Sequence, residues 1–187
     1  GLLKRVRNFL AHRSLNAPTR QAQVVEAARK KLVGSALRHL NDDARLKDLK
    51  GDIVTYFLHV DPEKSVDNSG SDIWPQMNVI RDLRKKLPPT TTLVVRDHPL
   101  IRGKRKLTDV RAIRQLPNTL YVSGQCDRNT LMVSSRFVST ISGSVALESA
   151  VRGATVLVYG RPIFLHHPHV FHVSEVQDFG DFGRQRR

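Results

Sequence analysis

The stretch FVSTISGSVALESAVRGATVLVY, residues 137–159, decides the fold. It begins with a β-rich run over 137–141, continues with a helical pattern over 144–152 and ends in a second β-rich run over 155–159. Two strands joined by a helical crossover of this length pair in parallel within one sheet. The stretch therefore predicts a βαβ unit of a parallel sheet.

The same alternation extends towards the amino terminus. The further expected elements are strands at 53–60, 92–96 and 119–122 and helices at 74–87, 107–116 and 130–135. Repeated βαβ units predict an α/β fold, a Rossmann-like parallel sheet with helices on both faces. The 187 residues suffice for one such domain with a buried core.

We place this domain at residues 51–165. Residues 1–50 are expected to form a basic helical lead-in or linker, with helical patterns over 2–10 and 18–40. Residues 166–187 show no regular pattern, and we expect an irregular tail that is frayed or truncated.

The net charge of +14 calls for an anionic partner. Residues 1–50 hold 12 Lys and Arg residues against 4 Asp and Glu residues, so the excess is concentrated there. Basic and apolar residues share the helical periodicity of this segment, which leaves two partners open. One is a protein surface, either of its own domain or of a neighbouring domain that this stretch of chain does not include, and the other is an anionic membrane surface.

Several protein classes are excluded or disfavoured. No run of about 18 apolar residues exists, which argues against a spanning helix, and no secretory signal core is present. The single cysteine, Cys126, cannot form an internal disulfide, which fits a reducing compartment. We therefore expect a cytoplasmic protein, either free or peripheral on the inner face of a membrane.

Walker A, GxGxxG and GxSxG sequences are absent, which disfavours P-loop, dinucleotide-binding and serine-hydrolase chemistry.

Ligands of open parallel sheets bind beyond the carboxyl ends of the strands, where polar residues follow each predicted strand. The candidates there are His59, Glu63, Arg96, His98, Pro99, Ser123, Ser142, Gly143 and Ser144. The four histidines from His166 to His172 match no closed zinc spacing, so no metal is expected.

The Ser142-Gly143-Ser144 turn joins a strand directly to a helix. A helix N-terminus with free amide groups and flanking hydroxyls predicts a phosphate site. The alternative is simple N-capping by Ser144. Glu148 lies one turn later, where it either reaches the ribose of a bound nucleotide or pairs with Arg152 as an exposed helix carboxylate.

His98 precedes Pro99, which restricts the local chain and holds the imidazole in a defined place. At the end of a strand, such a ring can donate to a phosphate or act as an acid. A structural histidine is the alternative.

Three segments together resemble the capsular polysaccharide synthesis family that includes Kdo transferases. They are YFLHVDPEKS at 56–65, LVVRDHP at 93–99 and TISGS at 140–144, the last followed by Glu148-Ser149-Ala150. Their order and spacing agree over roughly residues 52–165. This chain has Arg96-Asp97 before the His-Pro pair and Ser-Gly-Ser where the family more often has Thr-Gly-Thr.

The resemblance implies one half of a GT-B glycosyltransferase, the C-terminal domain that binds the nucleotide sugar. It implies a CMP-linked donor such as CMP-Kdo, a glycan or lipid-linked acceptor, and no metal or other cofactor. His98-Pro99 with Ser142 and Ser144 would contact the donor phosphate. The acceptor contacts and catalytic carboxylates would lie in the other domain, so the catalytic residues stay unassigned.

Two alternatives from other classes remain. A basic nucleic-acid-binding protein is suggested by the charge, although no RRM, KH, helix-turn-helix or zinc-finger pattern appears, so no specific nucleic acid is expected. A sugar-nucleotide epimerase-like domain would share the strand, Ser-Gly and Glu arrangement.

Overall fold

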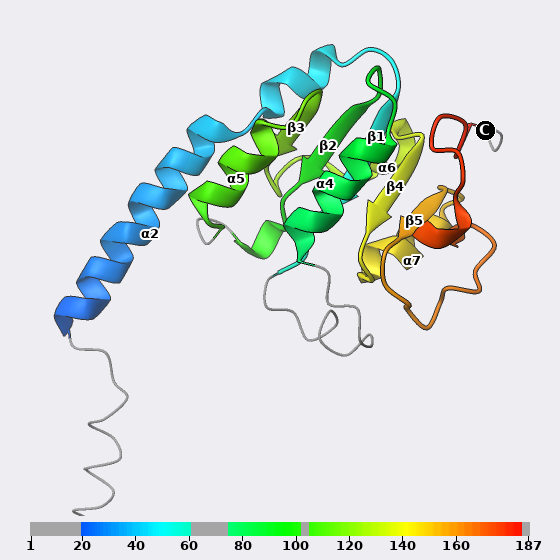
Figure 1. Ribbon diagram of the computed structural model, residues 1–187. Helices are drawn as coiled ribbons and strands as arrows, with labels where there is room; N and C mark the ends of the chain where they lie inside the picture. Colours follow the sequence, from blue (N-terminus) through cyan, green and yellow to red (C-terminus); the bar gives the residue numbers. More distant parts are fainter. Residues whose placement is uncertain (1–19, 61–74, 102–104, 185–187) are drawn as a thin grey trace, which may run out of the picture.

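The computed structural model describes residues 20–60, 75–101 and 105–184 (Figure 1). The helix expected over 2–10 and the candidate residue Glu63 lie outside these ranges.

A parallel sheet of six strands forms the centre of the domain, in the order β3-β2-β1-β4-β5-β6. The strands are β1 (Ile53–Phe57), β2 (Thr92–Arg96), β3 (Thr119–Val122), β4 (Phe137–Thr140), β5 (Val156–Val158) and β6 (Val170–His172). All neighbouring pairs are parallel. This is the strand order of the Rossmann fold, so the expected α/β fold is confirmed.

Helices cover both faces of the sheet. On one face α4 (Gln76–Lys86) and α5 (Leu107–Arg114) contribute Val79, Ile80, Leu83, Val110 and Ile113 to a buried cluster. On the opposite face α6 (Arg128–Ser134) and α7 (Ser144–Val151) pack a second cluster. Figure 1 shows α4 and α5 in front of the sheet and α6 and α7 behind it.

The segment expected to be irregular, 166–187, contains a strand. β6 pairs in parallel with β5, with Phe171 opposite Leu157, and the short 3-10 helix η3 (Val173–Glu175) follows it. A strand of three residues is too short to show an alternating pattern in the sequence. The histidine-rich loop before β6 obscures the pattern further. Its pairing with β5 supplies the order that local sequence does not indicate.

The helix α2 (Arg20–Leu40) contacts α5 and extends away from the sheet (Figure 1). After it, Asp42 joins the free edge of β3. The amide of Asp42 donates to the carbonyl oxygen of Tyr121 over 2.7 Å, and its carboxylate accepts the Tyr121 amide over 3.1 Å. The end of the expected lead-in therefore covers an edge of the sheet that would otherwise be exposed. Within the described ranges, no helix is long and apolar enough to cross a membrane.

Candidate functional site

A pocket of about 180 Å³ lies at the carboxyl ends of β1, β2 and β4. The helix after β1 covers one face of the sheet and the helix after β4 covers the other, so the strand order reverses here. Such a switch point is where open α/β sheets bind ligands. The polar and turn residues that line the pocket are His59, Arg96, His98, Pro99, Arg128, Thr140, Gly143 and Ser144.

His59 is buried at the end of β1. Its Nε2 lies 2.7 Å from Oγ1 of Thr140 and accepts the amide of Ile141 over 3.3 Å. The ring lies directly against Gly143, because a Cβ atom there would come 2.8 Å from Cε1 of His59. The glycine of the Ser-Gly-Ser turn therefore admits the histidine, which a larger residue would displace.

A buried network beneath the pocket joins β1, β2 and β3. Oδ1 of Asp97 accepts from Nη2 of Arg105 over 2.6 Å, and Oδ2 accepts from the Tyr121 hydroxyl over 2.6 Å. The same Nη2 donates to the carbonyl oxygen of His59 over 3.0 Å. Burial and the nearby Asp97 carboxylate raise the pKa of Tyr121 far above its usual range, so the hydroxyl remains a donor.

The sequence assigns no role at the site to Asp97 or Arg105, although Asp97 follows the second predicted strand. Asp97 stands directly before His98, which was the available signal in the sequence. Arg105 gives no such signal, because its partners lie 8 and 46 residues away along the chain.

His98 is partly buried, and both of its local hydrogen bonds are made with neighbours in the chain. Its amide donates to Oδ1 of Asp97 over 2.8 Å, and its Nδ1 accepts the amide of Leu100 over 3.2 Å. In the neutral ring an accepting Nδ1 places the proton on Nε2. The local turn therefore leaves His98 with Nε2–H as the donor for another group.

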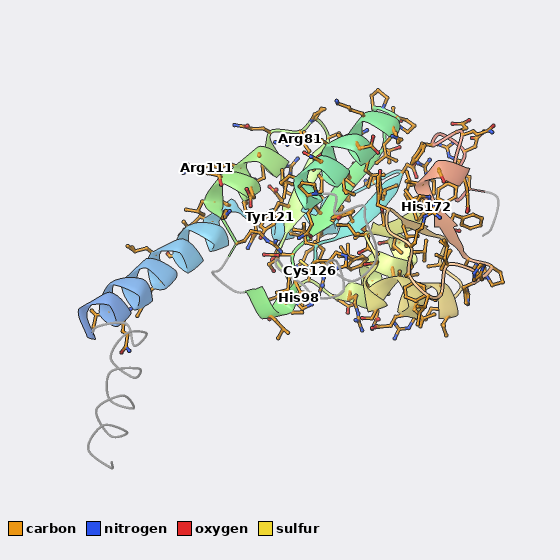
Figure 2. The ribbon with its side chains drawn as sticks, turned by 60° about the horizontal axis from the view of Figure 1, so that its bottom comes forward. Arg81, His98, Arg111, Tyr121, Cys126 and His172 are labelled. Carbon is orange, nitrogen blue, oxygen red and sulfur yellow. The ribbon has the colours of Figure 1, made fainter. Side chains whose placement is uncertain are left out.

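The β3–α6 loop packs closely on the His98-Pro99 turn. A Cβ atom at Gly124 would lie 2.6 Å from the backbone of Pro99. Figure 2 shows His98 and Cys126 near each other, in agreement with this contact. Burial raises the pKa of the Cys126 thiol to about 11, so a thiolate nucleophile is not available there at neutral pH.

Gly143, not Ser144, is the N-cap residue of α7, and a glycine has no side chain with which to cap the helix. Simple capping by Ser144 is therefore not what the structure shows. Gly143, Ser144 and Val145 line the pocket, so the first turn of α7 faces it. Ser142 is buried beside the turn and is not among the lining residues.

Glu148 lies beside the pocket and forms an ion pair with Arg128, with Oε2 and Nη1 2.8 Å apart. The alternative of a pairing with Arg152 does not hold, because Glu148 pairs with Arg128 and Nη1 of Arg152 lies 3.6 Å from the sulfur of Met132. The fold brings the start of α6 next to α7, and this proximity is not visible from spacing along one helix.

Arg96 places a positive charge at the pocket, and its guanidinium donates to the carbonyl oxygens of Gly124 and Cys126 over 2.8 to 3.1 Å. No described carboxylate forms an ion pair with it. Burial lowers the pKa of Arg96, and the neighbouring charge of Arg128 lowers it further. The pocket therefore carries two guanidinium groups, which favour an anionic ligand.

The remaining candidate, Ser123, serves the fold. Its amide and hydroxyl both donate to the carboxylate of Asp43, over 2.7 and 2.6 Å. It is not among the residues that line the pocket. Among the described residues, no group of three or more His, Cys, Asp or Glu side chains is arranged to hold a metal ion.

Comparisons with known proteins agree with this architecture. The structure is similar to that of Thermosulfurimonas dismutans KpsC, described as a beta Kdo 2,7 transferase, with a TM-score of 0.53 and 13% sequence identity. The match covers 81% of this chain and 50% of that one, so the chain spans half the length of that structure. No curated protein matches the chain. The model of the family named capsule polysaccharide biosynthesis protein matches residues 3–167. The chain therefore belongs to the capsule polysaccharide biosynthesis family.

Proposed function

We propose that this chain is the nucleotide-sugar-binding half of a GT-B glycosyltransferase that acts in capsule polysaccharide biosynthesis. The observation that carries the proposal is the pocket at the switch point, where Arg96, Arg128 and the first turn of α7 converge. The family and the KpsC-like fold support the same conclusion.

The donor phosphate lies on the first turn of α7 in this proposal. Backbone amides at a helix N-terminus and the helix dipole both favour an anion, and the Ser144 hydroxyl adds a donor. Nε2–H of His98 approaches from the neighbouring loop. These groups together offset the phosphate charge, so the proposed site uses no metal.

The size of the pocket supports a shared site. Pockets that enclose a small ligand usually measure about 300–1,000 Å³. At about 180 Å³ this pocket holds a phosphate and part of a nucleoside, but not a complete nucleotide sugar. We propose that a second Rossmann-like domain closes the cleft and supplies the acceptor contacts and the catalytic carboxylates.

The proposed donor is a CMP-linked acidic sugar such as CMP-Kdo, and the proposed acceptor is a glycan or a lipid-linked glycan. The support for Kdo is the description of the similar structure as a Kdo transferase, together with the family resemblance. The cationic pocket is suited to a donor that carries negative charge.

Calorimetric titration with CMP, UDP and GDP tests the proposal. We expect CMP to bind, and binding should persist in the presence of heparin. The absence of binding by all three nucleotides at millimolar concentration would contradict the proposal. Displacement by heparin or duplex DNA with a steep salt dependence would favour a nucleic-acid-binding protein instead.

A further inference from the structure

We infer that Arg128 is a phosphate ligand of the pocket and that Glu148 competes with the phosphate for it. This inference rests on the proposed function and assigns a role to an ion pair that the nucleotide site does not otherwise explain.

Arg128 is the first residue of α6, and Asp127 caps that helix by accepting the amides of Asn129 and Thr130. The cap fixes the backbone from which the Arg128 side chain extends. That side chain lines the same pocket as Arg96, His98 and Ser144. Arg128 therefore belongs to the pocket by position, although it follows β3 rather than one of the strands that carry the His-Pro and Ser-Gly-Ser turns.

Glu148 holds this guanidinium through an ion pair. It projects from the second turn of α7, and its carboxylate lies 2.8 Å from Nη1 of Arg128. The side chains of Arg128 and Glu148 are 40% and 38% exposed. Ion pairs with this exposure contribute little to stability, so the pair opens at little cost.

Charge explains why the pair exists and why a phosphate would replace it. Arg96 and Arg128 are close enough for the charge of Arg128 to lower the pKa of Arg96. Glu148 offsets part of this repulsion. A phosphate between Arg96, Arg128 and the first turn of α7 provides the same compensation and accepts charge-assisted hydrogen bonds from both guanidinium groups and the backbone.

This arrangement assigns Glu148 a role opposite to that of a ribose ligand. As a ribose ligand it would add affinity, and its removal would weaken nucleotide binding. As a competitor it reduces affinity, and its removal would strengthen binding. The two roles therefore predict effects of opposite sign for the same substitution.

The experiment measures CMP affinity by calorimetry for wild type, R128Q, E148Q and the double variant. We expect R128Q to weaken CMP binding about tenfold or more, because a hydrogen bond to a charged group is lost. E148Q should strengthen CMP binding about two- to fivefold, which corresponds to the contribution of an exposed ion pair. The gain should vanish when both substitutions are combined, because Glu148 acts through Arg128.

Two controls separate local from general effects. R111Q removes the same charge from an exposed position on α5 and should leave CMP affinity within about twofold. Figure 2 shows Arg111 far from His98, on the α2 side of the domain. Cytidine, which has no phosphate, should bind all the variants with equal affinity. If R128Q does not fold, R128K replaces it. This variant keeps the charge but loses the guanidinium hydrogen bonds, so CMP binding should still weaken.

The outcomes distinguish this inference from the proposed function. If CMP binds wild type and Ser144→Ala weakens it while R128Q and E148Q do not change it, the nucleotide site stands and the inference is wrong. Weaker CMP binding by E148Q would also overturn the inference in favour of a direct ligand contact. Failure of wild type to bind any nucleotide overturns the proposed function and the inference with it.

Discussion

Arg105 and Asp97 form a buried ion pair in which Nη2 lies 2.6 Å from Oδ1. The side chains are 8% and 9% exposed, and the same guanidinium group donates to the carbonyl oxygen of His59. Asp97 also accepts the amide of His98. The pair thereby fixes the two pocket histidines relative to each other, although they come from the ends of different strands.

Removing the cation of this pair should destabilise the fold strongly. Arg105→Met leaves the Asp97 carboxylate buried without its charged partner, and such a loss costs about 3 to 5 kcal/mol. We expect a decrease of this size in the free energy of unfolding, measured by urea denaturation. The matched control is Lys86→Met, which breaks the exposed pair with Asp82 and should cost less than about 1 kcal/mol. Equal effects of the two substitutions would contradict the role given to the buried pair.

Gly143, which lines the pocket, and Gly124, which packs against the His98-Pro99 turn, should differ in their tolerance of a methyl group. A Cβ atom at Gly124 would lie 2.6 Å from the Pro99 backbone, whereas one at Gly143 would meet the side chain of His59 at 2.8 Å. A side chain moves more easily than a backbone, so Gly124→Ala should cost more stability than Gly143→Ala. Overpacking of this kind costs about 1 to 3 kcal/mol. Thermal unfolding of the two variants gives the order, and the reverse order would contradict this reading of the two contacts.

Gly143→Ala should also weaken nucleotide binding in the proposed site, because it displaces His59 and alters the first turn of α7. The comparison is made at a temperature where both proteins remain folded. Unchanged CMP affinity in a folded Gly143→Ala variant would show that this close contact serves the fold alone.

The Ser144 hydroxyl should contribute to nucleotide affinity directly. It is at the first position of α7, it lines the pocket, and it is not the cap of its helix. Ser144→Ala should therefore weaken CMP binding by about 1 to 3 kcal/mol, with little effect on the stability of the fold. Ser134→Ala is the matched control. Ser134 is the last residue of α6, and its exposed hydroxyl donates to the carbonyl oxygen of Thr130. A larger loss of affinity in the control would exclude the assigned contact.

The fold and much of the pocket could be predicted from the sequence because a parallel sheet places the residues after its strands at one edge. His59, Arg96, His98 and the Gly143-Ser144 turn line the pocket as expected from this rule. Ser123 follows the same rule but is turned to Asp43, a residue 80 positions earlier that only the folded chain brings near. Arg128 was missed because it follows a strand by several residues and belongs to a helix that starts beside the pocket.

His98 provides the last prediction, because its two ring nitrogens have different tasks. Nδ1 accepts the amide of Leu100 and stabilises the turn, while Nε2–H is the proposed donor to the phosphate. Asparagine reproduces an acceptor near the position of Nδ1 but has no group near Nε2. His98→Asn should therefore keep the thermal stability of wild type within a few degrees and weaken CMP about tenfold, the loss of one hydrogen bond to a charged group. His98→Gln, which can place an amide donor nearer Nε2, should recover part of the affinity. Full affinity in His98→Asn would identify His98 as a residue that serves only the turn.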